Sequence, residues 1–286
     1  FETVEVIVNT WPASRWISEQ LATVNGISAL IRFPFPGTRL RELAKVVLGL
    51  DQNSEDPWKA NRLVWHILEV LPELLEKEEA SPLKEWLLER SSSPDQLSRD
   101  EWQLACTIAD AFDNYALYRT DDIAEWLKYI DKSPTKLESL NPQSDWQPLL
   151  MRLLCERIDS EPFGLQVKNA IERLRRDSTT SKNLPAQLHI FGISSLAPVQ
   201  VELIQALSGV LDIKVYLITP CRDLWHRCEL RRERLGPEWG TPPDGFWLLK
   251  APRLEANLGR MGAEFQQLLE GSGESQLGEW KEGDLF

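Results

Sequence analysis

The sequence predicts an α/β protein in which both ends of the chain build one parallel sheet and a large all-α subdomain is inserted between them. Short apolar, β-branched runs followed by amphipathic helices occur near the amino terminus and again after residue 183. The segment 57–176 instead keeps helical apolar spacing throughout. Because crossovers between parallel strands are right-handed and return to the same sheet, we expect one core made of 1–56 and 177–286.

The amino-terminal segment is expected to run strand, helix, strand, helix. Val4 to Val8 is a short β-branched run, and Pro12 stands just beyond it, where a helix starts. Gly26 is expected to end that helix. Ile27 to Phe33 then predicts a second strand, and the apolar spacing from Leu40 to Leu50 predicts an amphipathic helix.

The middle of the chain is expected to be entirely helical. Its apolar residues recur every three or four positions between Ser-Pro and Asn-Pro breaks. The expected helices are Trp58 to Leu71, Pro82 to Glu89, Arg99 to Leu117, Asp121 to Ile130, Asp145 to Ile158 and Gly164 to Arg175. Ser98 and Asp145 are suited to N-capping, and Asp177 to Asn183 is expected to be a polar linker.

The α/β pattern returns after the linker. Leu188 to Phe191 predicts a strand, Pro198 to Leu207 a helix and Leu211 to Ile218 another strand. We expect a loop over the Pro- and Gly-rich Pro237 to Pro252 and a final helix from Leu254 to Leu269.

Composition narrows the class of protein. The 286 residues hold 32 Lys and Arg against 44 Asp and Glu, a net charge of −12, which argues against a general nucleic-acid-coating protein. Four cysteines without a C-x-x-C spacing favour the reducing cytoplasm. The longest uncharged stretch, Asn183 to Val201, is too polar to span a bilayer. The chain opens at Phe1 instead of methionine, so we expect residues upstream.

The motifs of an NTPase or a metalloenzyme are missing from the sequence. No glycine is followed by lysine, and Gly192-Ile193 follows the Leu188 to Phe191 strand where an acidic pair would bind Mg²⁺. Three histidines are too few for a histidine-rich metal site, and His189 is expected to pack or cap. Cys221 and Cys228 lack further zinc ligands and are better explained as buried apolar residues. We therefore expect no catalytic and no metal-binding residues.

Local features of the sequence are nevertheless suited to binding single-stranded nucleic acid. Most of the 12 tryptophans fall on apolar helix faces, so core packing is the first expectation and stacking on bases the alternative. Thr10, Ser14 and Arg15 lie at a helix start, which suits anion binding. Two basic clusters are either solvated helix faces or walls that follow phosphates. They are Lys168, Arg173, Arg175 and Arg176, and Arg222, Arg227, Arg231, Arg232 and Arg234 around Trp225.

Several stretches of the sequence, taken together, resemble one family. They are Val8 to Trp16 with Ile31 to Pro36, Ala109 to Arg119, Phe191 to Pro198 with Thr219 to Trp225, and Leu258 to Gly262. In their order and spacing they resemble the gamma subunit of exodeoxyribonuclease V, the RecC type. The resemblance covers nearly the whole chain, as the amino-terminal part of a much longer subunit.

The resemblance implies a RecA-like core from a superfamily 1 helicase whose ATPase has decayed, with the helical subdomain inserted into it. Asn9 to Arg15 and Phe33 to Pro36 then occupy the places where active relatives grip single-stranded DNA. Gly192-Ile193 stands where those relatives carry an Asp-Glu pair for Mg²⁺. This chain is accordingly expected to have neither ATPase nor nuclease activity.

The resemblance also implies a heterotrimer that acts in DNA repair and recombination. The family's subunit joins RecB-type and RecD-type subunits, which use ATP and Mg²⁺; it splits the duplex and scans the strand that ends 3′ for the Chi sequence. By position, its scanning residues correspond here to Phe35, Arg41, Asp110, Ala111, Asp113, Asn114 and Arg119. Phe35, Arg41 and Ala111 differ from the aliphatic, aromatic and leucine residues expected there.

The residues expected to bind DNA are Thr10, Arg15, Phe33, Phe35, Arg41, Asp110, Asp113, Asn114, Arg119, Arg222 and Trp225. For Asp113 and Arg119, an ion pair within or between helices is an equally good explanation. Two other functions stay open for the whole chain. One is an acidic protein-interaction or scaffold domain without DNA contact, which the net charge favours; the other is a fragment of an AddB-like nuclease subunit.

Overall fold

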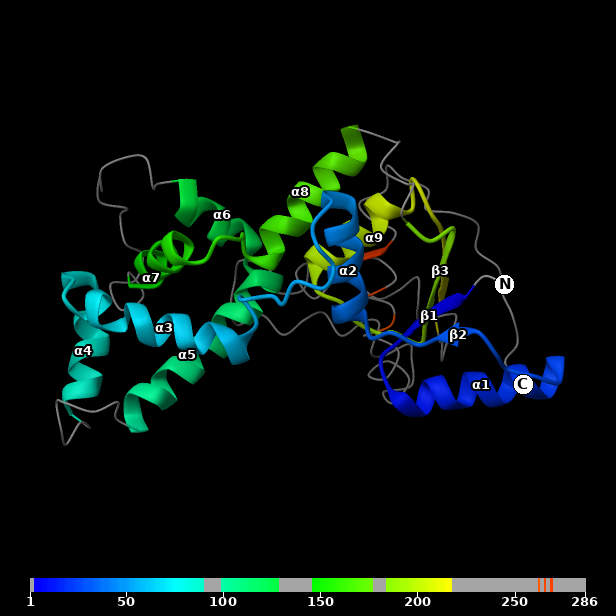
Figure 1. Ribbon diagram of the computed structural model, residues 1–286, viewed down its shortest axis with the longest axis horizontal. Coiled ribbons are helices and arrows are strands. Elements are labelled where there is room, and N and C mark those ends of the chain that lie inside the picture. The colour runs from blue at the N-terminus through cyan, green and yellow to red at the C-terminus, as the bar shows by residue number, and fades with distance from the viewer. Residues whose placement is uncertain are drawn as a thin grey trace, which may run out of the picture. The chain divides into compact units, whose positions relative to one another are not determined.

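The computed structural model describes residues 3–89, 99–128, 146–176 and 184–217, together with Gly262, Phe265, Leu268 and Leu269 (Figure 1). The chain forms two compact units. The first, which we call the α/β unit, comprises Phe1–Leu43 and Leu174–Phe286, and the second, the helical unit, comprises Ala44–Arg173. The sequence predicts a first boundary after residue 56, whereas the units divide after Leu43, inside a helix.

A four-stranded parallel sheet forms the centre of the α/β unit, which confirms the predicted α/β class with a parallel sheet. Its strands are β1 (Val4–Val8), β2 (Ile31–Arg32), β3 (Gln187–Phe191) and β4 (Asp212–Tyr216), in the order β2-β1-β3-β4. Chain segments from both sides of the helical unit thus meet in one sheet. Residues 6, 189 and 214 lie side by side across β1, β3 and β4.

Strand β2 is much shorter than the predicted strand from Ile27 to Phe33. It pairs with β1 only through Ile31 and Arg32. The backbone before it is not extended, because Leu30 has φ 60° and Gly26 has φ 74°. Pro34 follows shortly and has no amide to extend the ladder. The prediction of a long second strand was therefore wrong.

The α/β unit also contains α1 (Trp11–Asn25), α9 (Pro198–Leu207) and the first part of α2 (Pro36–Leu48) (Figure 1). Each starts with a proline in its first turn or directly at its first residue. The sequence predicted this for α1 and α9, whereas α2 begins at Pro36, before the predicted apolar run from Leu40. Thr10 caps α1, and Gly26 ends it in the left-handed conformation. Side chains alternate along β1, so α1 packs on the face with Val6 and Val8, and α2 reaches the opposite face at Glu5.

The helical unit contains α3 (Ala60–Leu75), the 3-10 turn η1 (Glu78–Ala80), α4 (Ser81–Leu88), α5 (Arg99–Tyr118), α6 (Thr120–Lys128), α7 (Trp146–Arg157) and most of α8 (Phe163–Arg176). These confirm the predicted helices to within a few residues. Helix α3 lies against both α5 and α7 (Figure 1) and contributes the fully buried Leu63, Ile67 and Leu74. Trp58 belongs to the same buried core, and its indole N–H donates a 2.8 Å hydrogen bond to the Ser160 carbonyl oxygen.

Gly164, near the start of α8, lies close against neighbouring residues of the helical unit. A Cβ atom there would come closer than 3.0 Å to the Ala116 carbonyl oxygen and to both γ atoms of Thr120. The Thr120 hydroxyl itself is buried and donates to the Ala116 carbonyl oxygen at 3.1 Å. Glycine is therefore needed here for close helix packing, not for backbone freedom.

Some predicted features lie outside the described residues. These are the N-caps Ser98 and Asp145, the linker Asp177 to Asn183, the loop Pro237 to Pro252, and Cys221 and Cys228. Of the predicted final helix, Gly262, Phe265, Leu268 and Leu269 are described and are helical. Gln205 of α9 donates hydrogen bonds of 3.1 Å to the carbonyl oxygens of Leu268 and Leu269. Within the described ranges, no helix is both long and apolar enough to cross a membrane.

Candidate nucleic-acid interface

A ligand of this fold is expected to bind at the carboxyl edge of the sheet. Strands β1, β3 and β4 are parallel, so they end at the same edge, at Val8, Phe191 and Tyr216. In open parallel sheets, ligands bind outside the carboxyl ends of the strands. The turn into α1 and the Gly192 turn both lie at this edge.

Four rings follow one another on the face of the sheet that α1 covers only in part. Trp16 of α1 lies 5.9 Å from Phe191, Phe191 lies 6.1 Å from Tyr216, and Tyr216 lies 5.9 Å from His189, measured between ring centroids. We call these four residues the aromatic row. The row lies on one face because strand pairing brings residues 191 and 216 side by side. Trp16 and Tyr216 are each 45% exposed, so the row presents ring surface to solvent.

His189 is the polar member of the aromatic row. Its Nδ1 lies 3.0 Å from the Tyr216 hydroxyl, and the two rings stack with an interplanar angle of 17°. Burial lowers the pKa of His189, the charge of Lys214 lowers it further, and Asp212 partly offsets this. The ring is therefore neutral at pH 7, and the prediction that His189 packs is confirmed.

A second aromatic contact lies at the start of α1. Trp11 is 67% exposed and meets Phe35 edge to face, with ring centroids 5.2 Å apart. Phe33, by contrast, packs against the cluster formed by Val6, Val8 and Ile17. Of the two phenylalanines predicted to bind DNA, the structure thus brings Phe35 to an exposed tryptophan, whereas Phe33 serves the packing of α1 on the sheet.

The start of α1 offers few amides to an anion. Pro12 has no N–H, and Thr10 accepts from the Ala13 amide through Oγ1 and from the Ser14 amide through its carbonyl oxygen, both at 3.3 Å. The Ser14 hydroxyl is buried and donates to the Trp11 carbonyl oxygen at 2.8 Å. The cap of the helix thus already uses the Ala13 and Ser14 amides, and the anion site expected at Thr10, Ser14 and Arg15 stays a prediction. Arg15 is largely exposed and pairs with Glu19 at 3.0 Å.

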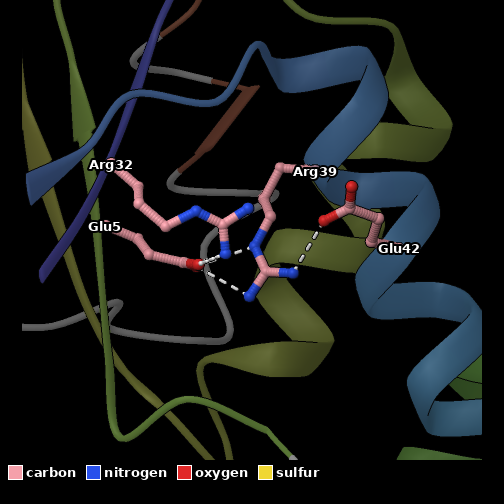
Figure 2. Close-up of polar contacts among 4 residues, drawn as sticks. All are labelled: Glu5, Arg32, Arg39 and Glu42. Carbon is pink, nitrogen blue, oxygen red and sulfur yellow. Dashed lines mark hydrogen bonds and ion pairs between the residues drawn. The ribbon is translucent and has the colours of Figure 1, made fainter. Parts of the chain in front are cut away.

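A nearly buried ion-pair network joins the sheet to α2, as Figure 2 shows. Arg39 Nε donates to Glu5 Oε2 at 2.7 Å and its Nη1 donates to Glu42 Oε2 at 2.9 Å. The more exposed Arg32 donates to Glu5 Oε1 at 3.3 Å. The side chains of Glu5 and Arg39 are only 9% and 11% exposed. Sequence reasoning missed this network, whose one visible signal is a glutamate at an inward position of an otherwise apolar strand.

The end of β3 carries no acidic group. Gly192 has φ 64° and donates its amide to the Tyr216 carbonyl oxygen at 3.0 Å, and Ile193 is buried. In the part of the chain that the structure describes, no three His, Cys, Asp or Glu side chains gather to hold a metal ion. The local chemistry of this edge is stacking and packing.

The predicted residues of the helical unit lie on and after α5. Asp110 and Asn114 are exposed, and Asn114 Nδ2 donates to the Asp110 carbonyl oxygen at 2.9 Å. Asp113 is partly buried. Arg119 Nε donates to Asp122 Oδ2 at 2.6 Å, so the ion pair foreseen as an alternative is present for this arginine.

The first basic cluster is partly engaged within the helical unit. Lys168 forms an ion pair with Asp121, and Arg173 Nη1 donates to the Leu48 carbonyl oxygen at 2.9 Å. These contacts fit a solvated helix face better than a wall that follows phosphates. The second basic cluster, including Arg222 and Trp225, lies outside the described residues.

The fold and its edge define an α/β protein with a large helical insertion and exposed rings beside the carboxyl ends of its strands. The chain belongs to the family described as RecC, N-terminal domain, whose model matches residues 1–286. This confirms the resemblance found from the sequence.

Named relatives agree with the family. The chain is 29% identical over 242 residues to the RecBCD enzyme subunit RecC of Haemophilus influenzae, covering 79% of this chain and 21% of the relative. It is 29% identical over 230 residues to that of Escherichia coli K12, covering 79% and 20%. It is 28% identical over 271 residues to that of Mycolicibacterium smegmatis, covering 94% and 23%. The chain thus spans about a fifth of the length of these relatives.

Proposed function

We propose that this chain is a non-catalytic part of a RecC-type subunit, and that it guides a single DNA strand ending 3′ along the carboxyl edge of its sheet. The observation that carries the proposal is the aromatic row. Family membership supports it, as do the relatives named as RecBCD enzyme subunits. In this proposal RecB-type and RecD-type subunits are the partners, they use the ATP and Mg²⁺, and the complex works in the cytoplasm in DNA repair and recombination.

The same proposal covers the architecture. Residues 1–56 and 177–286 form a degenerate RecA-like core, and residues 57–176 form its inserted helical subdomain. A parallel sheet with helices on both faces supports this assignment. A buried Ile193 directly after β3 supports the absence of a nucleotide-hydrolysing site, because a carboxylate for Mg²⁺ would have to stand near the end of a core strand.

Stacking supplies the binding energy in this proposal. Every base offers a π-face, so contacts between bases and aromatic side chains tolerate any sequence and contribute about 1–3 kcal/mol per base. Trp16 and Tyr216 at the two ends of the exposed surface stack on bases, with Phe191 between them. Trp11 with Phe35 provides a second stacking position. Arg15 contributes a charge for the phosphates from the exposed side of α1.

Scanning for Chi is the finer part of the proposal. We assign it to Phe35 and Arg41 in the α/β unit and to Asp110, Asp113, Asn114 and Arg119 in the helical unit. Exposed carboxylate and amide groups on α5 support this assignment, since such groups hydrogen-bond base edges. The exposed guanidinium of Arg119 at the end of α5 supports it as a group that can hold the backbone of the scanned strand, since guanidinium groups bind phosphates.

The proposal is tested by two measurements on the purified protein. Fluorescence anisotropy with a labelled 3′-tailed duplex and with blunt duplex should show tighter binding to the tailed DNA. An ATPase assay with the same preparation should show no turnover above that of a mock purification. ATP hydrolysis that survives purification, or equal affinity for tailed and blunt duplex, would refute the proposal.

A protein-interaction role is the second candidate, and one observation favours it. Trp65 of α3 and Trp102 of α5 lie 5.1 Å apart between ring centroids, and both are exposed on the acidic helical unit. Exposed aromatic surface of this kind is typical of protein interfaces. If this role alone were correct, substituting Arg15 or Trp16 would leave DNA affinity unchanged.

A further inference from the structure

One arginine in the helical unit is held by two aromatic rings and a carboxylate at the same time. The guanidinium carbon of Arg119 lies 4.7 Å from the ring centroid of Tyr115 and 5.5 Å from that of Trp126. Its Nε donates to Asp122 Oδ2 at 2.6 Å. We call Arg119, Tyr115, Asp122 and Trp126 the arginine cage. All four are described residues of the helical unit.

The local sequence explains why the arginine cage forms. Arg119 separates α5 from α6, and Tyr115 lies one turn before it on α5. Asp122 and Trp126 are four residues apart and so lie on the same side of α6. Backbone bonds fix the junction, since the Arg119 amide donates to the Tyr115 carbonyl oxygen at 2.8 Å and the Ile123 amide donates to the Arg119 carbonyl oxygen at 3.1 Å.

The two kinds of contact in the arginine cage use different parts of the guanidinium. Tyr115 and Trp126 attract the cation through the faces of their rings. Asp122 instead accepts the Nε–H group in the guanidinium plane, where a phosphate would also accept it. The side chains of Arg119 and Asp122 are each 42% exposed, so water and ions reach this pair. Ion pairs of this exposure are weak.

We propose that the Asp122 carboxylate is an internal competitor for the place of a strand phosphate on Arg119, and that Tyr115 and Trp126 are positioning residues that keep the guanidinium in place during the exchange. This rests on the proposed function, because it takes single-stranded DNA as the ligand. A bound phosphate replaces Asp122, whereas the rings stay in contact with the cation. Such an exchangeable contact is weak enough to be released when a strand moves along the protein.

The competition is tested with Asp122→Asn, which removes the competing charge but keeps the shape of the side chain. Anisotropy with fluorescein-labelled oligo-dT should show affinity raised about two- to fivefold, the fold-change that corresponds to an exposed ion pair. Glu125→Gln is the matched control. It removes one negative charge from the same helix at an exposed position outside the arginine cage. An equal rise in both variants would show a general charge effect and would overturn the proposal.

A double-mutant cycle with Arg119→Gln assigns the effect to the arginine. Arg119→Gln alone should weaken binding and lower the slope of log affinity against log salt by about 0.7, the value for one phosphate on a single strand. In this background Asp122→Asn should have no effect. A rise that persists there would overturn the proposal.

The positioning role is tested with Trp126→Leu, read in the same assay after a thermal melt has shown the variant to be folded. Affinity should fall about twofold or more with Arg119 present and stay unchanged in the Arg119→Gln background. No change in either background would overturn the positioning role.

The failure of this inference can be told apart from the failure of the proposed function. If the protein binds oligo-dT but Arg119→Gln binds equally well, the arginine cage contacts no phosphate and the inference falls, whereas strand binding at the aromatic row stands. If the protein does not bind oligo-dT at all, both fall.

Discussion

The two units of this chain differ in charge far more than in size. The helical unit contains 25 acidic and 15 basic side chains, a net charge of −10, whereas the α/β unit contains 19 and 17, a net charge of −2. The acidity that argued against nucleic acid is thus concentrated in one unit. The net charge of the whole chain therefore describes neither unit. The α/β unit, which contains the aromatic row, is nearly neutral.

The two units also differ in what holds them together. The helical unit rests on a continuous apolar core formed mainly by α3, α5 and α7. The α/β unit adds a nearly buried network of charges, in which Glu5 of β1 meets Arg39 of α2. The apolar core of the helical unit should exclude water from its thiols. In the α/β unit, removing one partner of the buried ion pair should lower the free energy of unfolding, because the other charge stays buried without it.

Cys155 tests how well the helical core excludes solvent. Burial raises the pKa of its thiol to about 12, and the charges of Glu161 and Glu156 add to this. Only the thiolate reacts with iodoacetamide. At pH 8, alkylation of Cys155 should therefore be about a thousandfold slower than alkylation of a thiol with the ordinary pKa of 9.0. The rate for Cys155 should rise as the pH rises toward 12. Peptide mass spectrometry measures this. Rapid labelling in the native state would show that the core is open, and urea-unfolded protein provides the reference rate.

Glu5→Gln tests the ion pair of the α/β unit. Arg39 would lose its shortest carboxylate partner while still nearly buried, so the free energy of unfolding should fall by about 3 kcal/mol. Urea denaturation followed by circular dichroism measures it. Arg32→Gln is the control: this arginine is largely exposed and contacts Glu5 at 3.3 Å, so its loss should cost less than about 1 kcal/mol. Equal effects of both variants would contradict the special role of Arg39.

Two Gly→Ala variants, one in each unit, should have opposite signs. Gly164→Ala places a methyl group against Ala116 and Thr120 and should cost about 2 kcal/mol. Gly37→Ala in α2 meets no atom within 4 Å and should stabilise by about 0.5 kcal/mol, because alanine favours helix more than glycine. Thermal melts measure the change in melting temperature of each variant relative to the unsubstituted protein. If Gly164→Ala did not lower the melting temperature, α8 would pack less closely than the structure shows.

Trp16→Leu and Tyr216→Leu test the aromatic row by its effect on DNA. Each variant removes one stacking surface, so affinity for oligo-dT should fall roughly five- to tenfold, as expected for about 1 kcal/mol of stacking or slightly more. Trp65→Leu is the matched control, an exposed tryptophan of the helical unit. A loss with Trp65→Leu as large as that with Trp16→Leu would show that stacking is not confined to the aromatic row and would contradict this prediction.

The aromatic row shows why part of the candidate site escaped sequence reasoning. For Trp16, as for the other tryptophans, the sequence offered stacking on bases only as the alternative to core packing. Phe191 and Tyr216 gave no such signal, since each occupies an ordinary position in an apolar strand. They meet Trp16 only because β3 pairs with both β1 and β4. For Arg119 the sequence left two roles open, and the structure adds contacts with Tyr115 and Trp126 that no spacing rule distinguishes from core packing.

Most local elements of this chain could be predicted from its sequence, because helix starts, helix ends and strand composition are properties of neighbouring residues. The bounds Pro198–Leu207 for α9 and Val4–Val8 for β1 were both obtained in this way. The short β2, the Glu5–Arg39 pair and the aromatic row could not be predicted in this way. Each of these depends on which distant segments pack together, and packing is set by the free energy of the whole chain and not by any one window of sequence.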